Sequence, residues 1–262
     1  MRLPLVLGSS AASRRAVLDA LGAAFSTLSP DIDERAVAGR SDTDARATAL
    51  AVAHAKASAL EPLARELLPG GCLLVAADQV VVGPDARARE KPESDAQARA
   101  FALSYSGAFA QTVSAVVVSA LLPGCSVVRA AGVEVSTVRF CEFGARDVDE
   151  MVAPGAAVPL TALLPLAESG AVDARFVYGS QEGHGRSGGG NGGSAGAAPS
   201  VFSCAGALCV EHEAYARRIE RIEGTLDGLH GLPLHLVRAL AQQVVRESGG
   251  GLELELLELL NE

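Results

Sequence analysis

The sequence predicts an α/β fold, in which strands and helices alternate along one chain. Two observations support this class. Short apolar runs rich in β-branched residues recur between segments whose apolar residues have helical spacing, and this alternation is typical of α/β proteins. In addition, 262 residues with 49% hydrophobic content are enough to bury a sizeable core.

Strands are predicted where short apolar runs end at turn residues. The first run is followed by the turn Gly8-Ser9-Ser10, and a turn around Pro123-Gly124 joins two later runs. The clearest run reads CLLVAADQVVV, with Asp78 as its one charged residue. The expected strands cover residues 3–7, 25–28, 72–82, 111–121, 133–140 and 201–210.

Helices are predicted where apolar residues recur every three or four positions after a capping residue. Ser13 is expected to cap the first helix, and Ser94 and Gln97 form a capping box before the third. Pro233 suits the first position of the last helix. The expected helices cover residues 14–21, 44–60, 146–152 and 233–247, and the helix after the capping box has Ala98, Phe101, Ala102 and Tyr105 on one face.

The chain is expected to form one domain over residues 1–247, interrupted by a flexible insertion at 168–200. From 185 to 200 the insertion reads GRSGGGNGGSAGAAPS, which offers too little apolar surface to offset the entropy of ordering. The glycines at 249–251 then separate an acidic, leucine-rich tail over 248–262, which can form an amphipathic helix.

Charge and hydropathy exclude several classes of function. A net charge of −9 and a pI of about 5.1 differ from the basic surface that tight nucleic-acid binding needs. No run reaches the roughly 20 apolar residues that span a bilayer, and the run at 3–7 is too short for a signal-peptide core. We therefore expect a cytoplasmic protein that binds neither nucleic acid nor membranes.

The cysteines indicate a reducing compartment, because their number, five, is odd and no CxxC pair occurs. Cys204, Cys209 and His212 lie close enough in sequence to suggest metal ligands, but a fourth ligand at zinc spacing is missing. We interpret these three as ordinary structural residues.

Asp78 is the strongest sign of a functional site, because it interrupts a strand that should be buried. An ionised carboxylate there is costly unless a metal ion, a cation or a strand-end position compensates it. Lys56 is also unusual, since it lies on the apolar face of its predicted helix. Both residues have structural alternatives: Asp78 can cap a turn, and Lys56 can extend its ammonium group to solvent.

Arg14 and Arg15 suggest an anion site at the start of the first helix. Positive charge opposes the helix dipole there, whereas helix N-termini and arginines both attract phosphate. Ser9 lies just upstream and can assist. The alternative is that both arginines extend into solvent.

A cluster of carboxylates, Asp31, Asp33 and Glu34, follows the second predicted strand. Such a cluster can hold Mg²⁺ or Mn²⁺, although solvated loop acids are the commoner case.

Lys91 lies in a loop directly after Glu90, where it can bind a ligand or simply belong to a turn. The sequence contains no GxxxxGK[ST] phosphate loop, no GxSxG elbow and no HExxH motif.

Taken in order, these segments resemble the Maf family. The resemblance spans about residues 3–245 outside the insertion, and its variant motifs look closest to those of eukaryotic members. The matching segments are Leu7-Gly8-Ser9-Ser10-Ala11-Ala12-Ser13-Arg14-Arg15, Pro30-Asp31-Ile32-Asp33-Glu34, Ala55-Lys56-Ala57, Ala76-Ala77-Asp78-Gln79-Val80-Val81-Val82, Arg89-Glu90-Lys91-Pro92, Tyr105-Ser106-Gly107 and Gly231-Leu232-Pro233-Leu234.

The resemblance implies a mixed-sheet α/β fold of the inosine-triphosphatase-like kind, with a cleft between two lobes. It implies hydrolysis of a nucleoside triphosphate to the monophosphate and diphosphate, with a divalent metal such as Mg²⁺, Mn²⁺ or Co²⁺, and it allows a homodimer. Asp78 would act as general base or metal ligand, and Glu34 would help to hold the metal. The residues expected to bind the triphosphate are Ser9, Arg14, Arg15, Lys56, Gln79 and Lys91.

The expected substrates are dTTP and UTP, and 7-methyl-GTP is an alternative supported by the spacing from Ser9 to Arg15. A non-catalytic nucleotide-binding regulator of cell division is a further alternative, but a pure binder would not need the buried Asp78. The sequence departs from the family pattern in three ways. It has Gln79 where Thr is frequent, Ala205 where Gln or Glu is common, and no proline before the arginines, and these departures bear on base specificity.

Overall fold

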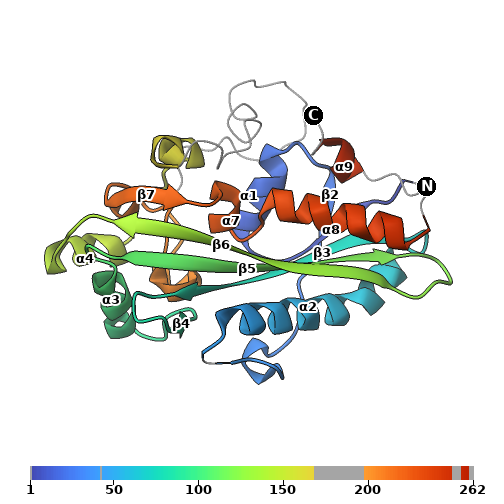
Figure 1. Cartoon of the computed structure of the whole chain (residues 1–262), viewed down its shortest axis with the longest axis horizontal. Coiled ribbons are helices and arrows are strands. Elements are labelled where there is room, and N and C mark those ends of the chain that lie inside the picture. Colours follow the sequence, from blue (N-terminus) through green and yellow to red (C-terminus); the bar gives the residue numbers. More distant parts are fainter. Residues whose placement is uncertain (1, 42, 168–197, 250–254, 260–262) are drawn as a thin grey trace. The chain divides into compact units, whose positions relative to one another are not determined.

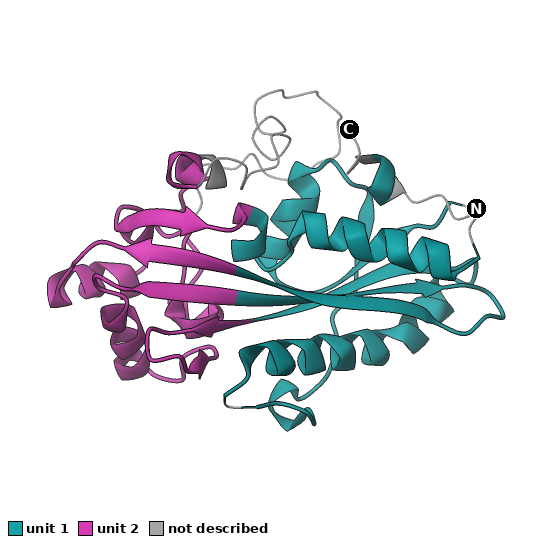
Figure 2. Cartoon of the chain, in the orientation of Figure 1, with its two compact units in different colours: residues 1–79, 113–135, 227–262 teal, residues 80–112, 136–226 magenta. Residues whose placement is uncertain are grey.

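A computed structural model describes residues 2–41, 43–167, 198–249 and 255–259 of the chain (Figure 1). These residues form two compact units (Figure 2). Unit 1 comprises residues 1–79, 113–135 and 227–262, and unit 2 comprises residues 80–112 and 136–226.

The sheet is mixed, which confirms the predicted fold class. Its strand order is β2-β1-β3-β5-β6-β7, and β4 pairs with β3 off this path. In unit 1, β1 lies between β2 and β3 and runs parallel to both. The strands are β1 (Leu5–Gly8), β2 (Phe25–Thr27), β3 (Cys72–Val82), β4 (Ala88–Arg89), β5 (Phe109–Leu121), β6 (Val128–Phe140) and β7 (Ile219–Glu223).

Helices cover both faces of the sheet within unit 1. In Figure 1, α2 (Ala45–Leu67) lies on one face and α8 (Leu234–Glu247) on the other. The unit also contains α1 (Ala12–Ala20), α9 (Glu255–Leu259) and most of α7 (Leu226–Leu229). The core under α2 is apolar and buried, and consists of Val6, Leu60, Ala64, Cys72, Leu74 and Leu121.

The second helix is longer than the sequence pattern predicts. Asp44 caps it by accepting a hydrogen bond from the backbone nitrogen of Ala47 at 3.0 Å. The helix was expected to end near residue 60, but it continues through Pro62 to Leu67. Leu60 and Ala64 are both buried in the core, so burial of one continuous apolar face outweighs the hydrogen bond that proline cannot donate.

Unit 2 contains the remaining elements. Within it, β4 pairs antiparallel with the end of β3, and β7 pairs antiparallel with β6. The helices and 3₁₀ turns of unit 2 are α3 (Asp95–Ser104), α4 (Ala145–Val152), η2 (Leu160–Leu166), η3 (Val201–Ser203), η4 (Ala205–Ala207) and α6 (Glu213–Ala216).

Helix caps are where the sequence pattern is least accurate. The predicted cap at Ser13 is wrong, because α1 begins at Ala12 and Ala11 is its N-cap residue. The cap at Ser94 is confirmed by a hydrogen bond from the backbone nitrogen of Gln97. Pro233 is the N-cap of α8 and therefore lies one residue before the expected position.

The strand predicted over residues 201–210 is wrong. This segment forms the two 3₁₀ turns η3 and η4. Gly206 and Ala207 have φ angles of 60° and 54°, which lie in the left-handed region and reverse the chain instead of extending it.

The described part of the C-terminal tail is the helix α9, which lies in unit 1. In the described part, α9 contacts α8, and Leu256 is buried. Arg2 forms an exposed ion pair with Glu258 at 3.3 Å.

Most of the predicted insertion, residues 168–197, lies outside the described residues. Among the described residues, no helix combines the length and apolarity that a membrane crossing requires.

Candidate active site

Polar side chains of unit 1 gather where the parallel strands β1 and β2 end beside β3. The strand β1 ends at Gly8, opposite Ala76 of β3, and β2 ends at Thr27, opposite Leu7. Because the carboxyl ends of parallel strands meet at one edge of a sheet, the segments that follow them lie close together. Ser9 and Arg14 follow β1, and Glu34 follows β2. Asp78 lies within β3, two residues past Ala76, which is paired with the last residue of β1.

Lys56 joins two carboxylates at this edge. Its ammonium nitrogen lies 2.7 Å from Oδ1 of Asp78 and 2.9 Å from Oε1 of Glu34. Asp78 is buried and points to the α2 face of the sheet, the same face as Leu74, because alternate residues of a strand share a face. The cation that a buried Asp78 requires is therefore Lys56, which is supplied by α2.

The Lys56 side chain is buried, so its position on the apolar face of α2 is explained by this ion pair and not by solvent contact. Glu34 differs from its partners, since 47% of its side chain is exposed. It stands at the start of the short 3₁₀ turn η1 (Glu34–Ala36). Asp33 caps that turn by accepting a hydrogen bond from the backbone nitrogen of Arg35 at 3.0 Å.

Arg14 is held inside unit 1 by two hydrogen bonds. Its Nε donates to the carbonyl oxygen of Gly231 at 3.0 Å, and its Nη1 donates to Oγ of Ser9 at 3.1 Å. Burial lowers the pKa of the Arg14 guanidinium, and the charges of Asp78 and Glu34 oppose that shift. The charge of Arg14 therefore interacts favourably with Asp78 and Glu34, whereas its hydrogen bonds go to Gly231 and Ser9.

Arg15, the next residue on α1, is exposed. The two arginines that the sequence treats as a pair are thus separated by the helix geometry, one inward and one outward. Ser9 is buried, and its Oγ also accepts a hydrogen bond from the backbone nitrogen of Ala11 at 3.1 Å.

Gln79 points to the face of the sheet opposite Asp78. Its Nε2 donates to Oγ of Ser114 at 3.0 Å and to the carbonyl oxygens of Gly228 and Leu229 at 3.1 and 3.2 Å. These contacts hold the segment that leads from α7 into α8. Gln79 therefore has a structural role in unit 1 that the sequence pattern, which assigned it to substrate, did not indicate.

Two further residues hold this segment and were not predicted from the sequence. Ser114 both accepts from Gln79 and donates to the carbonyl oxygen of Gly228 at 3.0 Å. Asp227 accepts hydrogen bonds from the backbone nitrogens of Gly228 and Leu234, so it fastens the entrance of α8. The only signal available for Asp227 was an acidic residue shortly before a predicted helix.

Lys91 belongs to unit 2, where it is exposed in the loop that follows β4. The preceding Glu90 accepts a hydrogen bond at its carbonyl oxygen from the backbone nitrogen of Gly206, at 2.8 Å. Ala205, where the family commonly has Gln or Glu, begins η4 and is therefore not in a strand.

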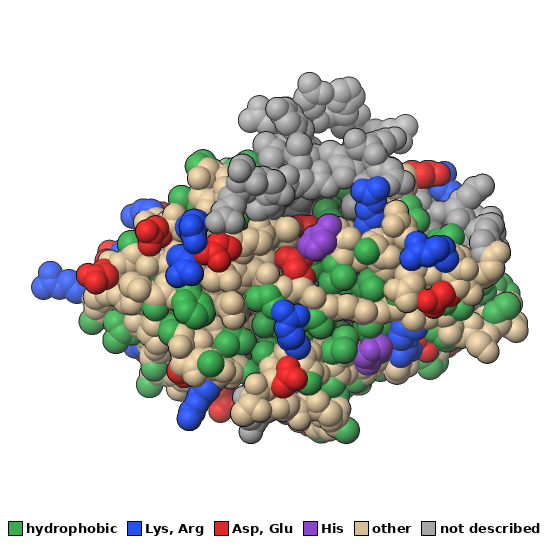
Figure 3. Space-filling model, viewed as in Figure 1, with side chains coloured by type: hydrophobic (Ala, Val, Ile, Leu, Met, Phe, Trp, Pro, Cys, Tyr) green, Lys and Arg blue, Asp and Glu red, His purple; other side chains and the backbone are tan. Residues whose placement is uncertain are grey.

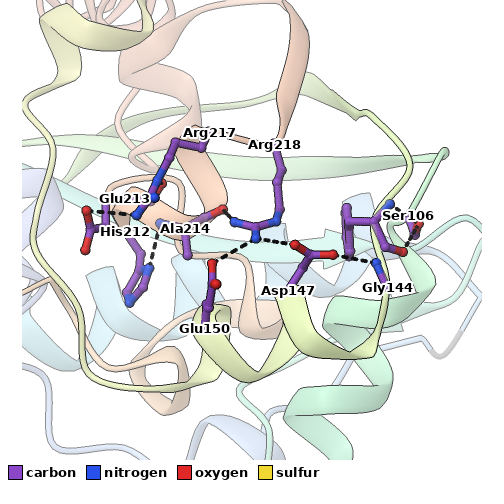
Figure 4. Close-up of polar contacts among 10 residues, drawn as sticks. Ser106, Gly144, Asp147, Glu150, His212, Glu213, Ala214, Arg217 and Arg218 are labelled. Atoms are coloured by element: carbon purple, nitrogen blue, oxygen red, sulfur yellow. Dashed lines mark hydrogen bonds and ion pairs between the residues drawn. The ribbon is translucent and has the colours of Figure 1, made fainter.

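A second polar cluster in unit 2 surrounds Arg218 (Figure 4). Arg218 contacts the carboxylates of Asp147 and Glu150, both on α4. His212 has a structural role, because its Nδ1 accepts from the backbone nitrogen of Ala214 and its Nε2 lies 3.0 Å from the carbonyl oxygen of Ala153. The structural interpretation of His212 made from sequence agrees with these contacts.

A divalent cation is compatible with the carboxylate pair. In the described part of the chain, no three His, Cys, Asp or Glu side chains converge as a ready set of ligands. Mg²⁺ and similar ions, however, need only one or two carboxylates, since water and substrate phosphates complete their coordination. Glu34 and Asp78 supply two carboxylates that already converge on one cationic atom.

Charged side chains of both signs are interspersed on the face of the molecule drawn in Figure 3. The two cations of the candidate site, Lys56 and Arg14, are buried residues of a chain with a net charge of −9.

Comparison with known proteins gives a consistent set of relatives. The sequence model of the Maf-like protein family matches residues 4–173. A 7-methyl-GTP pyrophosphatase of Dictyostelium discoideum is 29% identical over 244 residues, which cover 92% of this chain and 97% of the relative. The 7-methyl-GTP pyrophosphatase of Neisseria gonorrhoeae is 41% identical over 117 residues, 45% of this chain and 55% of that relative. That of Burkholderia orbicola is 45% identical over 76 residues, 29% of this chain and 34% of that relative.

Proposed function

The chain belongs to the family of Maf-like proteins and is a nucleotide pyrophosphatase, and we propose that it hydrolyses a nucleoside triphosphate to the monophosphate and diphosphate. The observation that carries this proposal is the pair of carboxylates, Asp78 and Glu34, that share the ammonium group of Lys56. Such a pair, at the carboxyl ends of the parallel strands β1 and β2, combines a base with a phosphate-binding cation.

Asp78 is the proposed general base. Hydrolysis at the α-phosphorus needs a water molecule that loses its proton as it attacks, and a carboxylate held in place can accept that proton. Lys56 compensates the charge of this buried carboxylate, because its ammonium nitrogen lies 2.7 Å from Oδ1. An ammonium group has three donors. With two directed at Asp78 and Glu34, the third is available for a phosphate oxygen.

We propose that Asp78 and Glu34 also hold the divalent cation that works with the substrate. When bound, the cation would neutralise charge on the triphosphate and help to orient the attacking water. Arg15 and Lys91, which are both exposed, are proposed to contact the triphosphate, whereas Arg14 and Ser9 support the site from within unit 1.

We propose two classes of nucleotide as the substrate, which differ in their nucleobase. The resemblance of the sequence implies the pyrimidine nucleotides dTTP and UTP. The names of the relatives, including one that aligns with 92% of this chain, favour 7-methyl-GTP instead. We therefore place 7-methyl-GTP first and the pyrimidine nucleotides second.

A panel assay tests the proposal. The purified protein is incubated with 7-methyl-GTP, dTTP, UTP and the other common triphosphates, with Mg²⁺, Mn²⁺ or Co²⁺, while diphosphate release is followed. We expect Asp78→Asn to lower kcat by about a hundredfold or more, the usual contribution of a positioned base. Asp19→Asn, at an exposed residue of α1, is the matched control and should retain activity.

The outcomes separate the alternatives. Turnover of no triphosphate, together with measurable nucleotide binding, would favour a non-catalytic binder. Full turnover by a folded Asp78→Asn protein would leave the reaction intact but refute the role given to Asp78. The ratio of kcat/KM for 7-methyl-GTP to that for dTTP shows which nucleobase the enzyme prefers.

A further inference from the structure

Two cysteines of unit 2 lie on either side of the turn η4. Cys204 immediately precedes Ala205, and Cys209 follows two residues after the end of the turn. Their sulfur atoms approach the carbonyl oxygens of consecutive residues: Sγ of Cys209 is 3.4 Å from Pro199 O, and Sγ of Cys204 is 3.6 Å from Ser200 O. Between the two cysteines, the left-handed residues Gly206 and Ala207 turn the chain back.

The two thiols differ in exposure and influence each other. The neighbouring Cys204 thiol is the main reason that the pKa of Cys209 is raised, and burial of Cys209 raises it further. Cys209 is fully buried, whereas Cys204 is partly exposed. The pair thus consists of one thiol that a solute can reach and one that only its neighbour can reach.

We propose that Cys204 and Cys209 form a reversible intramolecular disulfide, with oxidised glutathione as the oxidant. The Cys204 thiolate attacks one sulfur of oxidised glutathione, forms a mixed disulfide and releases one glutathione thiolate, which takes up a proton. The Cys209 thiolate then attacks the Cys204 sulfur and releases the second glutathione. Two cysteine thiols are oxidised and one glutathione disulfide is reduced to two thiols.

The exposure of the two sulfurs sets the order of these steps. Oxidised glutathione is bulky, so it reacts at the partly exposed Cys204 and not at the buried Cys209. The second step needs the thiolate form of Cys209, whose pKa is raised, so its rate should increase as the pH rises.

The disulfide would stiffen the turn that supports the loop carrying Lys91. The backbone nitrogen of Gly206 donates to the carbonyl oxygen of Glu90, and its carbonyl oxygen accepts from the hydroxyl group of Tyr105, both at 2.8 Å. A crosslink between the ends of η4 would restrict the backbone to which Glu90 is bonded. Disulfides in reducing compartments are usually transient and redox-sensing, which fits such a device.

Peptide mapping of the full chain tests the proposal directly. The protein is equilibrated in mixtures of reduced and oxidised glutathione, quenched with acid, alkylated and cleaved with chymotrypsin, which can cut after Leu208 between the two cysteines. We expect a peptide pair linked through Cys204 and Cys209 that disappears after treatment with a dithiol reductant, and that forms faster at pH 8.5 than at pH 7.

Variants identify the order of reaction. Cys209→Ser should stop at a glutathione adduct on Cys204, and Cys204→Ser should leave Cys209 as a free thiol. Cys141→Ser, at an exposed cysteine elsewhere in unit 2, is the control and should form the linked pair like the unaltered chain. The proposal is overturned if the unaltered chain accumulates separate glutathione adducts, or if Cys204 becomes linked to another cysteine. The readout is covalent, so it does not depend on the proposed enzymatic activity.

Discussion

The ammonium nitrogen of Lys56 lies 2.7 Å from Oδ1 of Asp78, and less than a tenth of either side chain is exposed. Removing one member of a buried pair leaves the other charge without compensation. Lys56→Met should therefore lower the free energy of unfolding by about 3–5 kcal/mol, as measured by urea denaturation. The double variant Lys56→Met/Asp78→Asn should recover much of this loss, because no isolated charge remains. Equal unfolding midpoints for Lys56→Met and the unaltered protein would contradict the prediction.

Glu34 is half exposed, so its bond to Lys56 should contribute little to stability. Glu34→Gln is expected to change the free energy of unfolding by less than about 1 kcal/mol. If Glu34 holds the cation, the same variant should need about tenfold or more divalent metal for half-maximal activity. Asp19→Asn, at an exposed residue of α1, provides the control for loss of an exposed carboxylate. An unchanged metal dependence of Glu34→Gln would remove Glu34 from the metal site.

Gly231 has a φ angle of +79°, and a Cβ atom added to it would lie 3.0 Å from Nε of Arg14. Gly249 has a similar φ of +83°, but an added Cβ would meet nothing within 4 Å. Gly249→Ala should therefore cost only the backbone strain, about 1–2 kcal/mol. Gly231→Ala should cost about 1 kcal/mol more because it also displaces Arg14. The difference between the unfolding free energies of the two variants in urea measures the cost of displacing Arg14. Equal values would show that Arg14 moves aside without cost.

A hydrogen bond from Arg218 lowers the pKa of Asp147, with a smaller contribution from the backbone nitrogen of Gly144. Because the pKa is lower in the folded state, this contact stabilises the fold above the ordinary carboxyl pKa of about 4. The stabilisation is lost as the pH falls through the lowered value.

Arg218→Met should therefore raise the pKa of Asp147 toward its ordinary value, as measured by NMR titration of the side-chain carboxyl group. The difference in unfolding free energy between the variant and the unaltered protein should be largest near neutral pH and should shrink below pH 4. A constant difference across that range would mean that Arg218 acts through packing and not through its charge.

The sequence was sufficient where the signal is local. The bounds predicted for β3 agree with the structure, because an unbroken apolar and β-branched run specifies a buried strand without help from distant residues. Asp78 stood out for the same reason, since a carboxylate within such a run is costly wherever the strand lies. The order of short motifs was enough to predict the family, which the family comparison confirms.

Other features depend on residues far apart in the chain, and only the tertiary structure decided them. Lys56 precedes Asp78 by 22 residues, and the two meet because α2 packs on the face of β3 that carries Asp78. Arg14 turns inward because Gly231, 217 residues later, offers a carbonyl oxygen, while the adjacent Arg15 remains exposed. Residues 201–210 have the composition of a strand, but left-handed backbone at Gly206 and Ala207 makes them turns. Local composition determines which residues are costly to bury, whereas the partners that compensate them are set by how helices pack on the sheet.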